Sequence, residues 1–396
     1  MMSRIVAAVV SIFGLSAAFY AVGSGDGVEL VNVESAENGL LALESASELS
    51  APPVLQNFYN DTYSTYHCSR HHDPGSLPDY FVIGVHKGGS TALYSYLSQH
   101  GNIRPATCKE TRFFVTDKAW KKGLTDYRRL FPDTSATPGI LTGEGTPSYI
   151  RIPKAVVRIA DAVPNAKFIV CFRNPTQRFI SHYVGQFHRE RTKLSCVNYF
   201  ERDRDALDTC INNYTPSQHK FMETDVQSET AWSALKRLAD PTKVADAIGE
   251  APANFASPDG TCAADDSHCK RRYCMGLNYE SAVVRSVYVD QLVRWLRFFP
   301  ADRILVTQSE AMFKDAPGTL NRVANFLGLR PFNEFEIERF TSANTGSSHH
   351  TSELFSTCDL DSLNAFFAPE NGLFEALLIK QFPEVYSRWI SWDDER

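Results

Sequence analysis

Residues 79–99 constrain the fold of this chain more than any other stretch, because an apolar run leads there into a glycine-rich loop. The run is Tyr80-Phe81-Val82-Ile83, and Gly84-Val85-His86-Lys87-Gly88-Gly89-Ser90-Thr91 follows it. The pattern predicts a strand, a tight loop and a helix. Paired glycines let the backbone approach a ligand, the helix start offers unpaired N–H groups, and Lys87 adds a positive charge. The stretch therefore predicts an anion site, with phosphate as the expected ligand.

The order of residues in this loop differs from that of the common nucleotide-binding loop, GxxxxGK followed by Ser or Thr. Here Lys87 precedes Gly88 and Gly89. A strand, a lysine, two small residues, a Ser-Thr pair and a helix resemble the 5′-phosphosulfate loop of sulfotransferases, which use 3′-phosphoadenosine 5′-phosphosulfate (PAPS). The resemblance implies that Lys87, Gly88, Gly89, Ser90 and Thr91 bind the 5′ end of PAPS.

A second motif begins at Cys171-Phe172-Arg173-Asn174-Pro175 and continues to Ser181 on a predicted helix. It resembles the 3′-phosphate-binding motif of sulfotransferases, which has an arginine at a strand end and a serine eight positions later. The resemblance implies that Arg173 and Ser181 hold the 3′-phosphate. A planar guanidinium suits this task because it makes bidentate, permanently charged contacts with phosphate.

A third motif, Lys109-Glu110-Thr111-Arg112-Phe113-Phe114, is similar to the Lys-Glu-x-x-Phe-Phe stretch of heparan sulfate and related Golgi carbohydrate sulfotransferases. The resemblance implies that Glu110 is the general base. A sugar hydroxyl must lose its proton as it attacks sulfur, and a positioned carboxylate contributes about 10²–10⁴-fold to the rate. Further similarity at 143–149 and 288–329 extends the resemblance to about residues 79–190 and 277–382.

The chain departs from the family pattern at two places. His86 stands before the lysine where the heparan sulfate enzymes often have another residue, and it is expected to be a bystander although histidine titrates near neutral pH. The late cofactor loop of many relatives contains Lys-Gly, whereas residues 344–350 contain no lysine. Ser347, Ser348 and His349 are nevertheless candidate ligands of the nucleotide phosphates.

Strands and helices alternate along most of the chain, and the predicted strands lie at 80–83, near 143–145, at 167–172 and at 303–306. This alternation predicts an α/β fold in which helices cover both faces of a central parallel β-sheet. The resemblance identifies it as the P-loop-like sulfotransferase fold. Residues 190–276 break the rhythm and are predicted to be an insertion. After them we expect one long helix at 277–299 and two helices at 359–367 and 371–381.

The formal charge of −6 argues against a general nucleic-acid binder. No pair among the nine cysteines has CxxC spacing, and the intervals between Cys262, Cys269 and Cys274 favour disulfides in an oxidising compartment over zinc. An odd total leaves at least one thiol free. Cys171, inside an apolar run, is predicted to be that thiol, and no metal site is predicted.

The N-terminus carries an uncharged apolar stretch of 18 residues from Ile5 to Val22. A bilayer core needs about 20 helical residues, so residues 1–22 are predicted to be a type II anchor or a cleaved signal peptide. Either would place a lumenal stem at 23–76 and a catalytic domain at 77–396 in the secretory pathway. Asn60 and Asn213 begin possible glycosylation sequons there.

These expectations combine into a Golgi enzyme, a PAPS-dependent sulfotransferase that acts on a hydroxyl or amine of a carbohydrate acceptor, either a polysaccharide or another glycan. Glu110 would be the base, and Lys87 would stabilise charge on the departing phosphate oxygen without a metal. Two alternatives stay open. A kinase-like phosphate-loop transferase would need magnesium and an acidic ligand, and a non-catalytic glycan-binding relative would keep the fold without turnover.

Overall fold

The computed structural model describes residues 5–12, 15–24, 27–32, 68–213, 270–271, 274, 280–340 and 354–392. The chain divides into two compact units, residues 1–62 and 63–396.

The N-terminal unit contains an antiparallel sheet of strands β1 (Ile5–Ile12), β2 (Leu15–Ser24) and β3 (Gly27–Asn32), in that order. The described residues of the apolar stretch that the sequence assigns to an anchor or signal peptide, 5–12 and 15–22, lie in β1 and β2. β1 is rich in valine and isoleucine, whose branched side chains favour strands. Among the described residues, no helix is long and apolar enough to cross a membrane.

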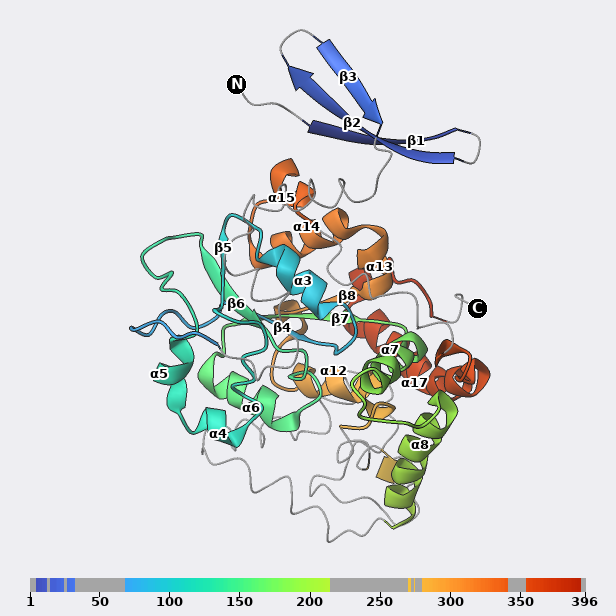
Figure 1. The fold of residues 1–396 in the computed structure, drawn as a ribbon. Coiled ribbons are helices and arrows are strands. Elements are labelled where there is room, and N and C mark those ends of the chain that lie inside the picture. The colour runs from blue at the N-terminus through green and yellow to red at the C-terminus, as the bar shows by residue number, and fades with distance from the viewer. Residues whose placement is uncertain are drawn as a thin grey trace. The chain divides into compact units, whose positions relative to one another are not determined.

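The second unit is built on a five-stranded sheet whose strands run parallel in the order β5-β6-β4-β7-β8 (Figure 1). The strands are β4 (Tyr80–Gly84), β5 (Ile103–Pro105), β6 (Leu141–Gly145), β7 (Lys167–Phe172) and β8 (Ile304–Gln308). This arrangement confirms the predicted parallel sheet. The first strand of the sheet, β4, lies at its centre between β6 and β7, so the strand order reverses there. In open α/β sheets, ligands bind at the carboxyl ends of strands at such a reversal.

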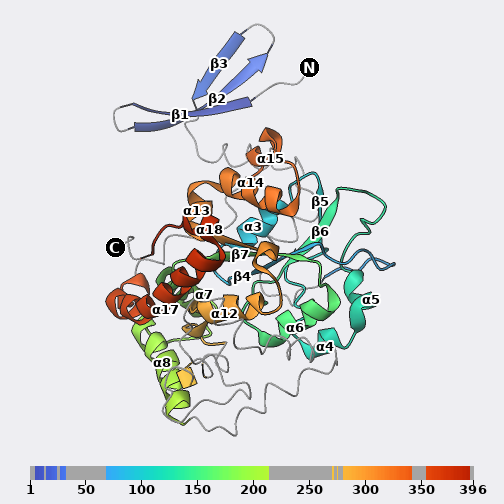
Figure 2. The same cartoon turned by 180° about the vertical axis from the view of Figure 1, so that it is seen from behind.

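Helices cover both faces of this sheet (Figures 1 and 2). One face carries α3 (Ser90–Leu97), α13 (Ser309–Lys314) and α14 (Ala316–Leu327). The other carries α6 (Pro153–Ala162), α7 (Pro175–Phe187), α12 (Val289–Leu296) and α17 (Leu360–Gln381). The described residues also form the helices α4 (Asp117–Trp120), α5 (Gly123–Arg128), α8 (Cys196–Asn212), α15 (Glu334–Glu338) and α18 (Pro383–Tyr386) and the short 3-10 turns η2 (Val284–Ser286) and η3 (Ala301–Arg303).

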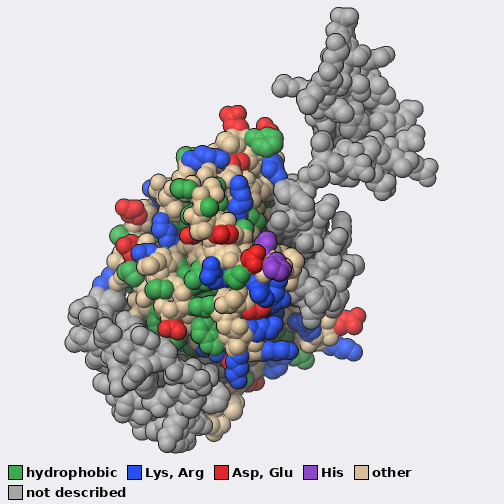
Figure 3. All heavy atoms as spheres, turned by 90° about the vertical axis from the view of Figure 1, so that its left-hand side faces the viewer, with side chains coloured by type: hydrophobic (Ala, Val, Ile, Leu, Met, Phe, Trp, Pro, Cys, Tyr) green, Lys and Arg blue, Asp and Glu red, His purple; other side chains and the backbone are tan. Residues whose placement is uncertain are grey.

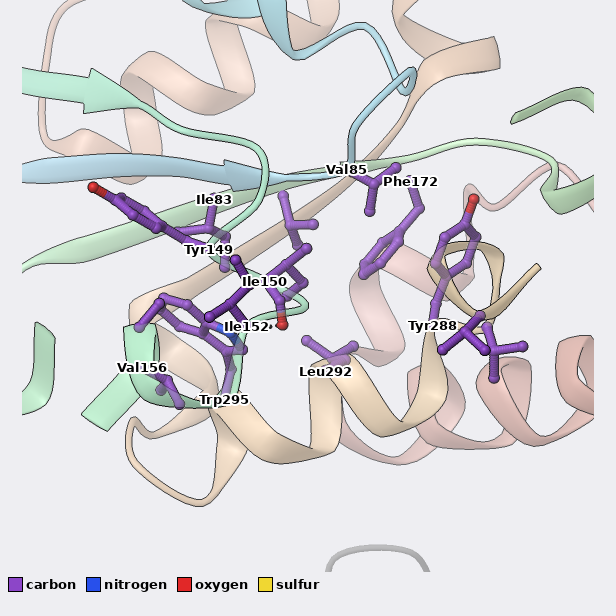
Figure 4. Packing of buried hydrophobic residues seen from close by; sticks show 14 of the residues in the cluster. Ile83, Val85, Tyr149, Ile150, Ile152, Val156, Phe172, Tyr288, Leu292 and Trp295 are labelled. Carbon is purple, nitrogen blue, oxygen red and sulfur yellow. Dashed lines mark hydrogen bonds between the residues drawn. The ribbon is translucent and has the colours of Figure 1, made fainter. Parts of the chain in front are cut away.

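The core beneath the carboxyl ends of β4 and β7 is apolar and closely packed (Figure 4). Val85 and Phe172 come from the strand ends, while Leu292 and Trp295 come from α12, and all four are almost fully buried. Trp295 also donates its indole N–H to the Ile150 carbonyl at 3.2 Å. Apolar burial at about 25 cal/mol per Å² stabilises this layer, which therefore fixes the two strand ends relative to each other.

The predicted long helix at 277–299 is wrong. η2 and α12 are separate, because Val287 adopts an extended backbone between them. Asp203 on α8 accepts hydrogen bonds from the Ala282 amide at 2.6 Å and the Ser281 hydroxyl at 2.8 Å. A carboxylate distant in sequence thus binds backbone and side-chain donors that precede η2, and this tertiary contact outweighs the helical spacing of the apolar residues.

Other boundaries also differ from the prediction. The two helices expected at 359–367 and 371–381 form the single α17, which contains Pro369. The predicted insertion begins with α8, whose Tyr199, Phe200 and Leu207 are buried in the domain core.

Three disulfides join Cys68 to Cys108, Cys196 to Cys358 and Cys210 to Cys274. They confirm the prediction that cysteines of this chain form disulfides. Cys171 is free and buried, as predicted. Cys262 and Cys269 lie outside the described residues.

Candidate active site

The loop after β4 has a shape that only glycine permits at two positions. A Cβ atom on Gly88 would lie 2.6 Å from the Cys171 carbonyl oxygen, and Gly89 has a φ of 81° at the start of α3. Ser309, at the start of α13, donates its hydroxyl to the Gly88 carbonyl at 2.7 Å. The loop is therefore held against β7 and the end of β8, with its backbone open to a close approach.

Lys87 lies in a strongly positive environment. Arg173 donates to the Lys87 carbonyl at 3.3 Å, and a Cβ atom on Gly185 of α7 would lie 3.7 Å from the Lys87 Nζ atom. Burial lowers the pKa of Lys87, and the neighbouring Arg189, Arg173 and Arg178 lower it further. The charges that act most strongly on the Lys87 ammonium group are thus positive. A bound anion would reduce the repulsion among these cations.

Ser90 and Thr91 form the first turn of α3, where backbone N–H groups have no partner within the helix. Ser90 is buried, and Thr91 is partly exposed. The structure therefore places all five residues of the predicted 5′-phosphosulfate loop, 87–91, between the end of β4 and the first turn of α3.

Arg173 follows β7 directly, so it lies at the same sheet edge as the loop after β4. Tyr288 donates its hydroxyl to the Arg173 carbonyl at 2.8 Å, and the Asn174 side chain caps α7 by accepting from the Gln177 amide at 3.2 Å. Ser181 is partly exposed in the middle of α7. The two predicted 3′-phosphate ligands therefore lie on one strand–helix unit that is adjacent to the Lys87 loop.

Arg178 on α7 connects the loop of Lys87 to the segment around η2. This residue was not identified from the sequence. Its fully buried guanidinium donates to the Ala282 carbonyl at 2.6 Å, the Ser286 hydroxyl at 2.7 Å and the His86 carbonyl at 3.4 Å. Burial lowers the pKa of Arg178 to about 10, so it stays charged at neutral pH. An arginine on the apolar face of α7, beside Phe179 and Ile180, was the available signal, because arginine is rarely buried without partners.

Glu110 lies between two cations. Its carboxylate accepts from Lys109 Nζ at 2.8 Å and from Arg112 Nη2 at 3.0 Å. Burial alone raises the pKa of Glu110, but the ion pairs with Lys109 and then Arg112 outweigh it and lower the pKa to about 2. The side chain is therefore ionised at neutral pH, and both its oxygens are engaged.

Glu144, at the end of β6, supports the loop that carries Glu110. It is fully buried and accepts four hydroxyl hydrogen bonds, from Tyr127 at 2.5 Å, Thr111 at 2.7 Å, Thr146 at 2.8 Å and Tyr149 at 2.9 Å. Burial raises the pKa of Glu144. Since Thr111 directly follows Glu110, this network fixes the position of the Glu110 loop. The sequence motif at 143–149 indicated family resemblance but not this role.

The late loop with Ser347, Ser348 and His349 lies outside the described residues, so its assignment stays a prediction. Within the parts of the chain that are described, no group of three or more His, Cys, Asp or Glu side chains is placed to hold a metal ion.

The family model of the sulfotransferase domain matches residues 77–345. The chain therefore belongs to the sulfotransferase domain family, as the three motifs predicted.

Two curated relatives illustrate the match. The membrane-associated sulfotransferase kil1 of Dictyostelium discoideum is 24% identical over 267 residues, which cover 64% of this chain and 56% of the relative. Heparan sulfate glucosamine 3-O-sulfotransferase 3B1 of Homo sapiens is 28% identical over 300 residues, which cover 75% of this chain and 55% of the relative. The chain thus spans about half the length of these relatives. Among solved structures, a sulfotransferase from Alicyclobacillus acidocaldarius superimposes with a TM-score of 0.45 at 20% identity, covering 78% of this chain and 99% of that one.

Proposed function

We propose that this chain is a PAPS-dependent sulfotransferase that moves a sulfuryl group to a hydroxyl or amine of a carbohydrate acceptor. The observation that carries the proposal is the positive environment of Lys87, to which Arg173, Arg178 and Arg189 contribute at the carboxyl ends of β4 and β7. PAPS is a polyanion with a phosphosulfate at one end and a 3′-phosphate at the other, so it matches both the charge and the family of the domain.

The residues present fit such a nucleotide. Gly88 and Gly89 leave the backbone open, and the first turn of α3 offers N–H groups to the 5′ end. Arg173 and Ser181 would hold the 3′-phosphate. When bound, PAPS supplies the activated sulfuryl group. Lys87 would stabilise negative charge on the phosphate oxygen that leaves, an electrostatic role worth about 3–4 kcal/mol in comparable sites.

Glu110 is the proposed general base, and its ion pairs set a condition on that role. A carboxylate with a pKa of about 2 accepts a proton weakly, because proton transfer is most efficient when the pKa lies near the working pH. The contact with Arg112, whose side chain is 48% exposed, must therefore loosen when the acceptor binds. Lys109 is buried and would continue to position the carboxylate.

A glycan with anionic groups suits the basic face near Glu110. The face of the domain shown in Figure 3 gathers many Lys and Arg side chains. The exposed basic residues on the loop of Glu110 and on or beside α4 and α5 are Arg112, Lys118, Lys121, Lys122, Arg128 and Arg129. The heparan sulfate named in the description of one relative supports this choice of acceptor.

The Golgi lumen is the proposed location, with residues 1–22 as anchor or signal peptide. The three disulfides support an oxidising compartment, since cytosolic thiols are kept reduced.

The test is calorimetric binding of 3′-phosphoadenosine 5′-phosphate (PAP), the product nucleotide, to the full chain. We expect binding to be lost in Lys87→Ala and Arg173→Ala and kept in Lys122→Ala, which removes an exposed lysine far along the sequence from both motifs. Preference for ATP with magnesium over PAP would instead support the kinase-like alternative. PAP binding without sulfuryl transfer to any glycan tested would identify a non-catalytic relative.

A further inference from the structure

Two histidines lie together inside the proposed phosphate site. His86 directly precedes Lys87, and His182 directly follows Ser181 on α7. Their ring centroids are 5.6 Å apart, with the ring planes at 67°. The two histidines therefore come from the loop after β4 and from α7, which carry the residues proposed to bind the 5′-phosphosulfate and the 3′-phosphate.

Both rings have a buried nitrogen without a partner. Among the described residues, neither His86 Nδ1 nor His182 Nδ1 has a hydrogen-bond partner. The other ring nitrogen of His182 lies 3.4 Å from Gln186 Nε2. A buried polar atom left unsatisfied destabilises the fold, so native proteins seldom keep one without a water, an ion or a functional reason. Two such atoms in one place, beside Lys87 and Ser181, suit a polar ligand.

The charges around the pair are mostly positive. Burial lowers the pKa of His86, and Arg285, Arg178 and Lys87 lower it further, while Glu110 opposes them. Burial also lowers the pKa of His182, and Arg178, Arg285, His86 and Lys87 act in the same direction. Both rings are thus neutral at neutral pH. An anion bound beside them would oppose these effects and raise the pKa of both rings, because a nearby negative charge favours the protonated ring.

We propose that His86 and His182 form a proton-accepting pair of the anion site, which takes up a proton from solvent when a phosphate or sulfate group binds beside Lys87. The protonated ring then offers a second N–H donor and a positive charge, whereas a neutral ring has one N–H and no charge. His86 and His182 are positioning residues for the nucleotide in this proposal. The inference rests on the proposed function, because PAPS is the anion concerned.

Calorimetry of PAP binding to the full chain tests this directly. Titrations at pH 7.5 in buffers of different ionisation enthalpy give the number of protons exchanged. At this pH a phosphate with a second pKa of about 6 is already ionised and releases few protons itself. We expect net uptake by the wild type, and none by the His86→Gln/His182→Gln double variant. The exposed His72→Gln is the matched control and keeps the uptake.

The affinity of the chain for PAP should depend on pH because the same proton is taken up on binding. By linkage, uptake of one proton makes PAP binding weaken by up to about tenfold per pH unit as pH rises, and the double variant loses this dependence. A pair that only packs the core would change stability but not the proton count. Circular dichroism checks folding, and the two single variants, each with reduced uptake, replace the double variant if it is unfolded.

The outcomes separate the two proposals. PAP binding without proton uptake, or with uptake that survives in the double or single variants, overturns the histidine pair and leaves the sulfotransferase proposal standing. Absence of PAP binding overturns the sulfotransferase proposal. Inorganic sulfate then serves as the probe of the histidine pair. If sulfate does not bind, or binds without a proton uptake that depends on the two histidines, the proposal for the pair is overturned as well.

Discussion

Glu110, the proposed general base, has a pKa that is determined by neighbouring charges and by burial. Its ordinary pKa of 4.5 is lowered to about 2 in the folded chain by Lys109 and Arg112, against the opposing effect of burial. A depressed carboxyl pKa stabilises the fold above the unfolded pKa, and this contribution is lost as pH falls through the folded pKa. Glu110 therefore stabilises the protein fully above about pH 4.5 and stops doing so near pH 2.

Glu110→Gln should reveal this contribution. At pH 6 we expect the variant to lose about 3 kcal/mol of unfolding free energy, since each pKa unit corresponds to about 1.4 kcal/mol. The side chain is only 14% exposed, so solvent screens the ion pairs weakly. Urea unfolding at pH 6 and at pH 3 measures the effect, which should fall to less than half at the lower pH. An equal loss at both values would show that the ion pairs are not its source.

Each residue that the sequence missed has partners that are distant in the chain, although Glu144 also accepts from the nearby Thr146 and Tyr149. Arg178 donates to acceptors more than 90 positions away, and Glu144 accepts from Tyr127 and Thr111 on a separate segment. By contrast, Lys87, Gly88 and Arg173 could be proposed as site residues because each belongs to a local motif at a strand end. Local spacing predicts which backbone turns toward a ligand, but not which buried side chains hold that turn in place.

At the scale of elements, prediction was best where one continuous apolar run decides the structure. β4, β7 and β8 were placed within one or two residues because parallel strands buried on both faces leave no polar alternation to interpret. The prediction failed at 277–299, where the spacing of apolar residues is helical. There Asp203 accepts a hydrogen bond from the Ala282 amide, just before η2. The order of the strands in the sheet was not predicted, because nothing local in the sequence specifies which strands become neighbours.

The loop before α3 allows a matched test of backbone and steric requirements. Gly89 and Gly123 have nearly the same φ, 81° and 80°, but a Cβ atom on Gly89 would lie 2.7 Å from Met312 Cε, whereas one on Gly123 meets nothing. Gly123→Ala should therefore cost only the left-handed backbone strain, about 1 kcal/mol. Gly89→Ala adds a contact with the end of the flexible Met312 side chain, which has to shift, so the variant should cost somewhat more and also weaken PAP binding.

Urea unfolding and PAP calorimetry on both variants measure the difference. Equal losses of unfolding free energy, with PAP affinity unchanged in Gly89→Ala, would contradict a steric role for Gly89 in shaping the loop.

For the whole molecule, the disulfides should contribute according to the length of chain that they close. Cys196 and Cys358 are 162 positions apart, and Cys68 and Cys108 are 40 apart. The loop-entropy relation gives about 5 kcal/mol for the first bridge and about 4 kcal/mol for the second.

Double alanine variants of each bridge test this order by urea unfolding under non-reducing conditions. We expect Cys196→Ala/Cys358→Ala to lower the unfolding free energy more than Cys68→Ala/Cys108→Ala. The reverse order would show that lost packing at each site, rather than chain closure, determines the cost.

The central position of β4 also determines when the site can exist during synthesis. β4 pairs with β6 about 63 residues later and with β7 about 87 residues later, and β7 pairs with β8 after 136 more. Translation at roughly 5–20 residues per second makes the last of these intervals on the order of ten seconds. Ser309, which holds the Gly88 carbonyl, follows β8. The Lys87 loop is thus made first among the parts of the sheet, yet it acquires its final support only when most of the chain has left the ribosome.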